Sequence, residues 1–253
     1  MRLVTIPFSH FCEKARWALD HAGLAYVEDG HAPMLSWAAA VTASGQRQVP
    51  VLVPDEGRAV AGSTAILRWA DAHRQADASE LWPEVHDRAL ATYVAELDRT
   101  LGPAARRVAY FTLLKEAELM RELLTASAGP WEKRVVGAGW RTLAAGIRRG
   151  LRVDAAGSAR SREVLTRVFD EADRRLAEGP YLVGDAFGAA DLTFASLATP
   201  VLFPPELEAW MLPLSRLPAD AREDVERLRA RPAGRHALRV YAEKRPRSCP
   251  ASR

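Results

Sequence analysis

The chain has 253 residues, of which 48% are hydrophobic and 26% charged, a composition typical of a globular protein with its own core. No apolar stretch approaches the roughly 18 residues of a membrane span, and the N-terminus lacks a signal-peptide core, so we expect a cytoplasmic protein. The net charge is only +3 because 35 basic residues are interleaved with 32 acidic ones, which argues against nucleic-acid binding. The two cysteines, Cys12 and Cys249, lie at opposite ends of the chain and predict neither a disulfide framework nor a metal site.

The first twenty residues predict a strand, a turn and a helix. Leu3–Ile6 is a short apolar run that stops at Pro7, and apolar residues recur at helical spacing after Cys12, with Gly23 just past the helix end. The turn carries the hydroxyl of Ser9 and the thiol of Cys12. A helix N-terminus has unpaired N–H groups and a partial positive charge, so it stabilises a nearby anion. We therefore interpret this turn as a place to hold a thiolate.

The next fifty residues complete a β-α-β-α-β-β-α order. The first two strands are expected to be parallel because a helix intervenes. A turn rich in proline, acid and glycine then predicts an antiparallel pair. The predicted elements are a strand at Leu24–Glu28, a short helix at 32–42, strands at Val49–Val53 and Arg58–Ala61, and a helix capped by Ser63.

Helical periodicity takes over from Glu84 onward, and strand signals vanish. We interpret the polar, turn-rich segment 74–83 as a linker. The sequence thus predicts a sheet-containing domain at 1–76 and an all-helical domain at 84–245. Within the second domain, Gly102-Pro103 is expected to break a helix that ends near Leu101.

A second helix start is predicted at Gly188, with Asp191 at the third helical position. The Asp191 carboxylate can reach back to the backbone N–H of Gly188, which is half of a capping box. We interpret Asp191 as a structural residue rather than a catalytic acid.

Three motifs within residues 3–73 resemble those of the cytosolic glutathione transferases. Ser9–Leu19 is similar to the active-site turn of members with serine or cysteine at its first position. Val49–Leu52 is similar to the family's cis-proline strand start, and Ser63–Ile66 to its serine-x-alanine-isoleucine helix start. Residues 180–193 resemble the family's C-terminal signature. The resemblance implies a thioredoxin-like domain followed by an all-helical one, in a cytosolic homodimer that serves detoxification.

The resemblance also implies an activity: the protein would stabilise the glutathione thiolate and add it to a small, hydrophobic electrophile. Ser9 would donate its O–H to the sulfur, with Cys12 as a second candidate catalytic group, and no metal is needed. Tyr110 and Phe111 would line the electrophile pocket. Glutathione, as co-substrate, would be bound by Phe11, Arg47, Gln48, Val49, Pro50, Ser63 and Thr64.

Two other interpretations stay open at this point. Gly62 and Gln48 stand where many relatives carry an acidic or amide residue and a basic residue, which favours a non-catalytic, ligand-binding member of the fold. Arg47 could substitute by reaching the glycine carboxylate of glutathione. Alternatively, Cys12 could be a low-pKa thiolate at the helix end, as in a glutathione-dependent thiol–disulfide or dehalogenation enzyme.

Overall fold

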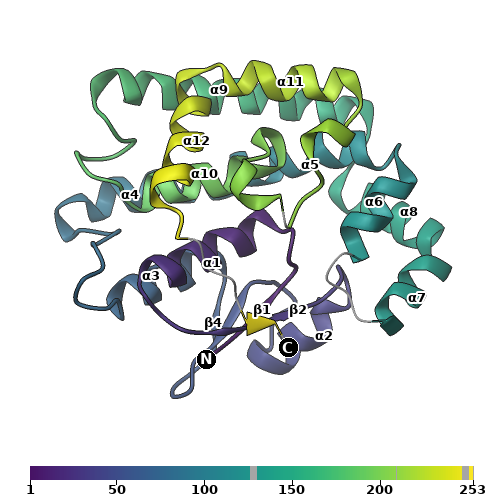
Figure 1. Ribbon diagram of the computed structural model, residues 1–253, viewed down its shortest axis with the longest axis horizontal. Helices are drawn as coiled ribbons and strands as arrows, with labels where there is room; N and C mark the ends of the chain where they lie inside the picture. The colour runs from purple at the N-terminus through teal and green to yellow at the C-terminus, as the bar shows by residue number, and fades with distance from the viewer. Residues whose placement is uncertain (126–129, 209, 247–250, 253) are drawn as a thin grey trace.

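The computed structural model describes residues 1–125, 130–208, 210–246 and 251–252. Its first part has the predicted β-α-β-α-β-β-α order, and a helical part follows, so the predicted fold class is confirmed (Figure 1). The elements of the first part are β1 (Arg2–Thr5), α1 (His10–His21), β2 (Val27–Gly30), α2 (Ser36–Ser44), β3 (Val51–Val53), β4 (Val60–Ala61) and α3 (Ser63–Ala72).

The sheet is mixed, with the strand order β4-β3-β1-β2 and a short fifth strand, β5 (Ala251–Ser252), beside β2. β1 pairs with β2 in parallel, as the intervening helix predicts, and β3 runs antiparallel to both β1 and β4. Helices α1 and α3 lie between the sheet and the helical part, whereas α2 lies on the opposite side (Figure 1). The carboxyl end of β1 therefore delivers the chain into the junction between the two parts.

The second part is helical from its 3₁₀ turn η1 (Glu84–His86) onward. Its helices are α4 (Asp87–Arg99), α5 (Leu101–Leu113), α6 (Ala117–Thr125), α7 (Pro130–Ala138), α8 (Trp140–Leu151), α9 (Ala155–Glu178), α10 (Ala189–Leu202), α11 (Ala219–Arg229) and α12 (Pro232–Lys244), with 3₁₀ turns η2 (Pro205–Leu207) and η3 (Leu214–Arg216). None of the helices that the structure describes is both long and apolar enough to cross a membrane.

The helix break predicted at Gly102-Pro103 lies two to three residues earlier, at Thr100, between α4 and α5. Gly102 and Pro103 belong to the first turn of α5 instead. A proline is tolerated in a first helical turn because its missing N–H would have no intrahelical partner there. Gly102-Pro103 therefore marks the start of α5 rather than the end of α4.

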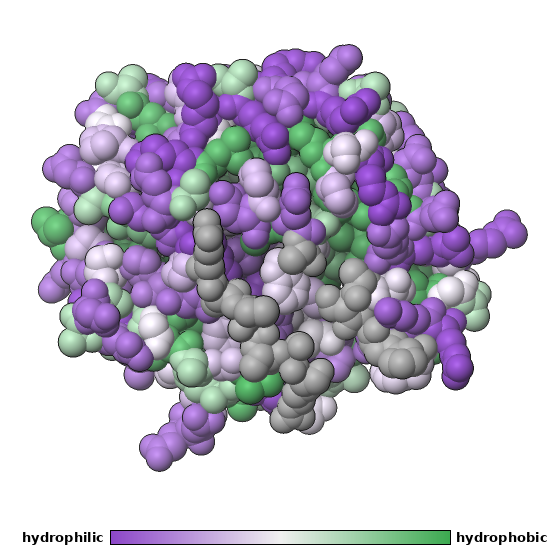
Figure 2. Space-filling model, viewed as in Figure 1, coloured by the Kyte–Doolittle hydropathy of each residue, from purple (hydrophilic) through white to green (hydrophobic). Residues whose placement is uncertain are grey.

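The core continues from the first part into the second. Helix α10 is buried at every position except Pro200, and it packs against α1, α4, α5 and α12. Trp17 of α1 and Tyr241 of α12 are fully buried, with ring centroids 4.5 Å apart. Hydrophilic residues cover most of the face shown in Figure 2. The relative position of the two parts is thus set by apolar packing around α1 and α10.

Candidate functional site

Ser9 is the N-cap of α1. Its backbone N–H donates to the carbonyl of Ile6 at 2.9 Å, and its own carbonyl accepts from Glu13 at 2.8 Å. The Ser9 side chain makes no capping hydrogen bond to the helix, and it lines a cavity. The structure therefore places a hydroxyl donor beside the positive end of a 12-residue helix, where both favour an anion.

Cys12 lies one turn further along α1 and is fully buried. Its sulfur accepts a hydrogen bond from the backbone N–H of Ile6 at 3.4 Å. Burial raises the pKa of the Cys12 thiol to about 11, against the opposing effects of the Arg16 charge and of the hydrogen bond from the Ile6 backbone. A thiol with such a pKa is protonated at neutral pH and is a poor nucleophile. The environment favours a packing role for Cys12.

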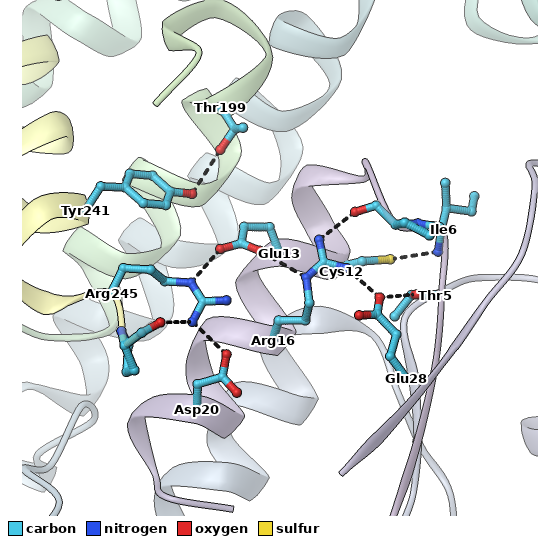
Figure 3. Close-up of polar contacts among 12 residues, drawn as sticks. Thr5, Ile6, Cys12, Glu13, Arg16, Asp20, Glu28, Thr199, Tyr241 and Arg245 are labelled. Carbon is cyan, nitrogen blue, oxygen red and sulfur yellow. Dashed lines mark hydrogen bonds and ion pairs between the residues drawn. The ribbon is translucent and has the colours of Figure 1, made fainter. Parts of the chain in front are cut away.

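A buried network of ion pairs holds the turn before Ser9 (Figure 3). Arg16 donates to the carbonyl of Pro7 at 2.7 Å, to Glu28 at 2.7 Å and to Glu13 at 3.0 Å. Arg245, beyond the end of α12, donates to the second oxygen of Glu13 at 2.8 Å. Because charge-assisted bonds of this kind are strong and directional, they fix the backbone of the turn against α1 and β2.

The backbone segments predicted to bind glutathione lie at the end of the sheet where β1 leads into the Ser9 turn. β3 is antiparallel to β1 and β4, so its start lies beside the end of both. The Val49–Pro50 peptide bond at this start is cis, as predicted, and the Gly62 N–H donates to the Pro50 carbonyl at 2.9 Å. Ser63 follows as the first residue of α3 and is buried. The topology thus brings the Ser9 turn, Val49 and the start of α3 together.

Ser63 was predicted to cap α3, but the N-cap is Gly62, one position earlier. Gly62 has φ of +96°, a conformation that side-chain-bearing residues rarely adopt. No atom lies within 4 Å of the position a Cβ would take, so backbone conformation rather than crowding selects glycine here. The position accordingly offers a ligand no side chain.

The Thr64 side chain is engaged within the protein. Its hydroxyl accepts from the Lys14 ammonium at 2.5 Å and donates to Asp98 at 2.6 Å, and Lys14 and Asp98 form an ion pair at 2.9 Å. Lys14 is fully buried, so this cluster ties α1, α3 and α4 to one another. Only the backbone of Thr64 is left for a ligand.

The other predicted glutathione-binding residues lie in two different environments. Arg47 and Gln48 are exposed in the loop before Val49. Phe11 instead packs against Gly102 of α5, so closely that a Cβ on Gly102 would collide with its ring. Phe11 therefore contributes to the contact between the two parts and does not line the cavity.

The cavity beside Ser9 has a volume of about 510 Å³ and lies between the two parts of the chain. Of the two residues expected in the electrophile pocket, Tyr110 lines this cavity and Phe111 does not; Phe111 packs under the Lys115 ammonium, 4.1 Å from its ring centroid. The described lining residues are Ile6, Phe8, Ser9, His10, Pro33, Met34, Trp37, Arg106, Ala109, Tyr110, Leu113, Leu123, Gly146, Ile147, Gly150, Leu151, Pro200, Phe203, Met211 and Leu212.

Most of this lining could not be assigned from the sequence, because it comes from six separate helices and four loops. One signal was available. Arg106, Tyr110 and Leu113 are spaced i, i+4 and i+7, which places them on one face of α5. Because Tyr110 was expected in the pocket, this spacing indicated that Arg106 faces the pocket as well, a residue that the sequence prediction did not include.

His10 and Arg106 set the electrostatics of the cavity wall. Burial, reinforced by the charge of Arg106, lowers the pKa of His10 to about 3, so the imidazole is neutral. Its Nε2 lies 3.1 Å from the Gly102 carbonyl and must carry the proton that it donates. Among the described lining residues, Arg106 is the one side chain charged at neutral pH. The described part of the chain holds no group of three or more His, Cys, Asp or Glu side chains placed to bind a metal.

Comparisons with known proteins find a family match in each of the two parts of the chain. Residues 3–78 match a family model described as glutathione S-transferase, N-terminal domain, and residues 155–230 match glutathione S-transferase, C-terminal domain. Together the two matches cover more than half of the chain. No curated protein sequence matches.

Similar solved structures extend the likeness over nearly the whole chain. Glutathione transferase F7 from Populus trichocarpa has a TM-score of 0.58 at 15% identity, over 97% of this chain and 99% of that one. A glutathione S-transferase from Rhodospirillum rubrum F11 has a TM-score of 0.57 at 19% identity, over 94% and 91%. Glutathione S-transferase-I bound with the ligand lactoylglutathione has a TM-score of 0.57 at 15% identity, over 94% and 98%. At these identities the likeness shows the fold.

Proposed function

The chain belongs to the glutathione transferase family, and we propose that it joins the glutathione thiolate to a small electrophile held in the cavity beside Ser9. One observation carries the proposal: the Ser9 hydroxyl, at the N-terminus of α1, opens onto a largely apolar cavity that the helical part closes. A thiolate placed there would gain a hydroxyl donor and the helix N-terminus, both of which lower a thiol pKa. The family also supports a cytoplasmic homodimer with a detoxification role, built from domains 1–76 and 84–245.

Glutathione would occupy the end of the sheet described above. The Val49 backbone would pair with its cysteinyl unit, next to Pro50, in the manner of an added β-strand. The N–H groups of Ser63 and Thr64, at the start of α3, would hold the γ-glutamyl carboxylate. Arg47 and Gln48 are exposed in the adjoining loop, and Arg47 would reach toward the glycine carboxylate.

Phe11 would act through its packing on α5, by keeping the Ser9 turn at its distance from the helical part. Tyr110 would contact the electrophile from the cavity wall, and Phe111 would support α5 from outside the cavity.

In the reaction, the glutathione thiol releases its proton to solvent and Ser9 donates its hydroxyl hydrogen bond to the resulting thiolate. The sulfur then forms a bond to the electrophilic carbon, and the leaving group departs with the bonding electron pair. Ser9 forms no covalent bond to the substrate in this scheme. It acts by stabilising the anion, so its removal should raise the pKa of the bound thiol as well as slow turnover.

The alternative chemistry through Cys12 has less support. A buried thiol with a pKa of about 11 offers neither the thiolate nor the access that disulfide exchange or dehalogenation needs. A non-catalytic, ligand-binding role would use the same cavity without turnover, and it is separated from the proposed activity by experiment.

The test combines calorimetry of glutathione binding with turnover of a nitro-activated aryl chloride by wild type, Ser9→Ala and Cys12→Ser. We expect wild type to bind glutathione, and Ser9→Ala to lose on the order of 10- to 100-fold in kcat, as for loss of one hydrogen bond to a charged group. The pH profile of kcat/KM should shift to higher pH in Ser9→Ala, and Cys12→Ser should keep turnover within a few-fold.

Three outcomes contradict the proposal. A wild-type protein that does not bind glutathione refutes it at the first step. Binding without turnover assigns the chain to the non-catalytic role. Loss of activity in Cys12→Ser alone transfers the chemistry to Cys12.

A further inference from the structure

Arg106 is a charged side chain in the largely apolar cavity beside Ser9. It lies on α5, one turn before Tyr110, and is partly buried. The described residues give its side chain no hydrogen bond, ion pair or ring contact. Burial lowers the pKa of Arg106; the Tyr110 phenol opposes this effect, and the positive charge of Arg107 adds to it.

Other partly buried arginines have partners. Arg107 donates to the Leu151 carbonyl at 2.9 Å and to the Ser161 hydroxyl at 2.7 Å. Arg231 pairs with Asp173 at 2.6 Å, and Arg245 with Asp20 at 2.6 Å. A cation withdrawn from water without such a partner is costly. Arg106 is therefore the place in the cavity where an incoming anion gains most.

The groups around Arg106 define the shape of that anion. A guanidinium presents a planar set of donors that matches the two oxygens of a carboxylate. The nearby Tyr110 phenol is neutral, because burial raises its pKa, and its O–H can donate as well. His10 is neutral and donates to the Gly102 carbonyl, so it brings no negative charge to compete. The remaining lining, including Phe8, Met34 and Ile147, is apolar.

We propose that Arg106 binds a carboxylate on the electrophile, so that the preferred substrates are small apolar acids rather than neutral molecules. This inference rests on the proposed conjugation at Ser9, which sets the reacting end of the substrate. A carboxylate of glutathione itself is the other possible source of the anion. Arg106 lies on α5 in the helical part, whereas the proposed glutathione contacts lie on β3 and α3, and this separation favours the electrophile.

The first experiment compares a matched pair of electrophiles, 4-chloro-3,5-dinitrobenzoate and 4-chloro-3,5-dinitrobenzamide. With both, the glutathione sulfur bonds to the ring carbon, chloride leaves with the bonding pair, and the thiol proton passes to solvent. Each kcat/KM is divided by the rate constant of the uncatalysed reaction with glutathione. Wild type should prefer the acid, and Arg106→Met should reduce the acid-to-amide ratio by about 10- to 100-fold. Arg106→Lys, which keeps the charge, should retain part of it.

Arg99→Met is the matched control, because it removes the same charge from an exposed position on α4. It should keep the wild-type ratio. Equal use of acid and amide by wild type overturns the inference, as does an Arg106→Met protein with the wild-type ratio. If calorimetry shows that Arg106→Met weakens glutathione binding by the same factor as it weakens use of the acid, the carboxylate belongs to glutathione and the inference fails.

The second experiment works without turnover and so separates this inference from the proposed function. Calorimetry measures binding of 3,5-dinitrobenzoate and 3,5-dinitrobenzamide, which lack a leaving chloride, to wild type and Arg106→Met. A preference of wild type for the acid that Arg106→Met abolishes supports the anion site even if conjugation fails. Equal affinities in wild type refute the site even if conjugation succeeds.

Discussion

Replacing Asp191 by alanine should destabilise the protein strongly. The Asp191 side chain is fully buried at the start of α10 and accepts three hydrogen bonds: from the backbone N–H of Leu182 at 3.0 Å, from that of Gly188 at 3.2 Å, and from His236 at 2.7 Å. The His236 Nδ1 accepts from Arg239, which can only donate, so Nε2 carries a proton and donates it to Asp191. Asp191 therefore joins the loop before α10, the helix start and α12.

The expected magnitude follows from these contacts. Asp191→Ala leaves two buried N–H groups and one imidazole N–H without their acceptor, at about 1–3 kcal/mol each when taken separately. Such losses are not additive among neighbouring groups, so the total is expected to fall toward the lower part of their summed range, at about 3–5 kcal/mol. For a chain of this size, about 2–4 °C of Tm corresponds to each kcal/mol, so the expected fall in Tm is roughly 6–20 °C.

The assay is thermal unfolding followed by circular dichroism, with activity measured on the folded protein at low temperature. Asp185→Ala is the matched control, because Asp185 is exposed on the same loop, and its Tm should move by less than about 2 °C. An Asp191→Ala protein with the wild-type Tm would refute the structural role. If turnover is also lost while the Tm stays at the wild-type value, Asp191 acts as a catalytic acid instead.

Two further predictions concern the contact between Ser9's turn and α5. Gly102→Ala should lower the free energy of unfolding by about 1–3 kcal/mol, because the added methyl group collides with the Phe11 ring. Gly137→Ala is the control: it has open space around it in α7 and should leave stability equal or higher. Urea unfolding that finds the two variants equally stable would contradict this prediction. His10 has a folded pKa of about 3 and an unfolded pKa near 6.5, so its contribution to stability is present above pH 6.5 and is lost as the pH falls toward 3, where the unfolded chain takes up the proton first. Urea unfolding at pH 7 and pH 4 should therefore show a smaller loss for His10→Gln than for wild type, and an equal loss in both would show that His10 is not the group responsible.

Local elements of this protein were readable from the sequence because each depends on near neighbours in the chain. The apolar run Leu3–Ile6, the helical spacing after Cys12 and the glycine- and proline-marked turns predicted the order of the first part, which the structure confirms. The half capping box was also readable, since Asp191 and Gly188 are three residues apart and meet as predicted. Boundaries were less certain, because a glycine or proline can mark the end of one helix or the start of the next, as Gly102 shows.

The chemistry of the site depended on partners that only the tertiary structure could supply. Nothing near Thr64 in the sequence indicates a partner for its hydroxyl, yet Lys14 and Asp98, from two other helices, form hydrogen bonds with it. Cys12 has the position of a helix-end thiolate, but burial under the Ile6 turn raises its pKa.

Sequence alone therefore determined the order of elements, the strand–turn–helix around Ser9 and the family to which the chain belongs. Tertiary structure decided which side chains face the cavity, which are engaged elsewhere, and where an unpaired charge is left. The physical reason is range: backbone geometry and hydrophobic periodicity act over a few residues, whereas burial and ion pairing depend on groups tens of residues apart. Arg106 shows the difference, since its residue type is one of many arginines and only its place in the cavity gives it a role.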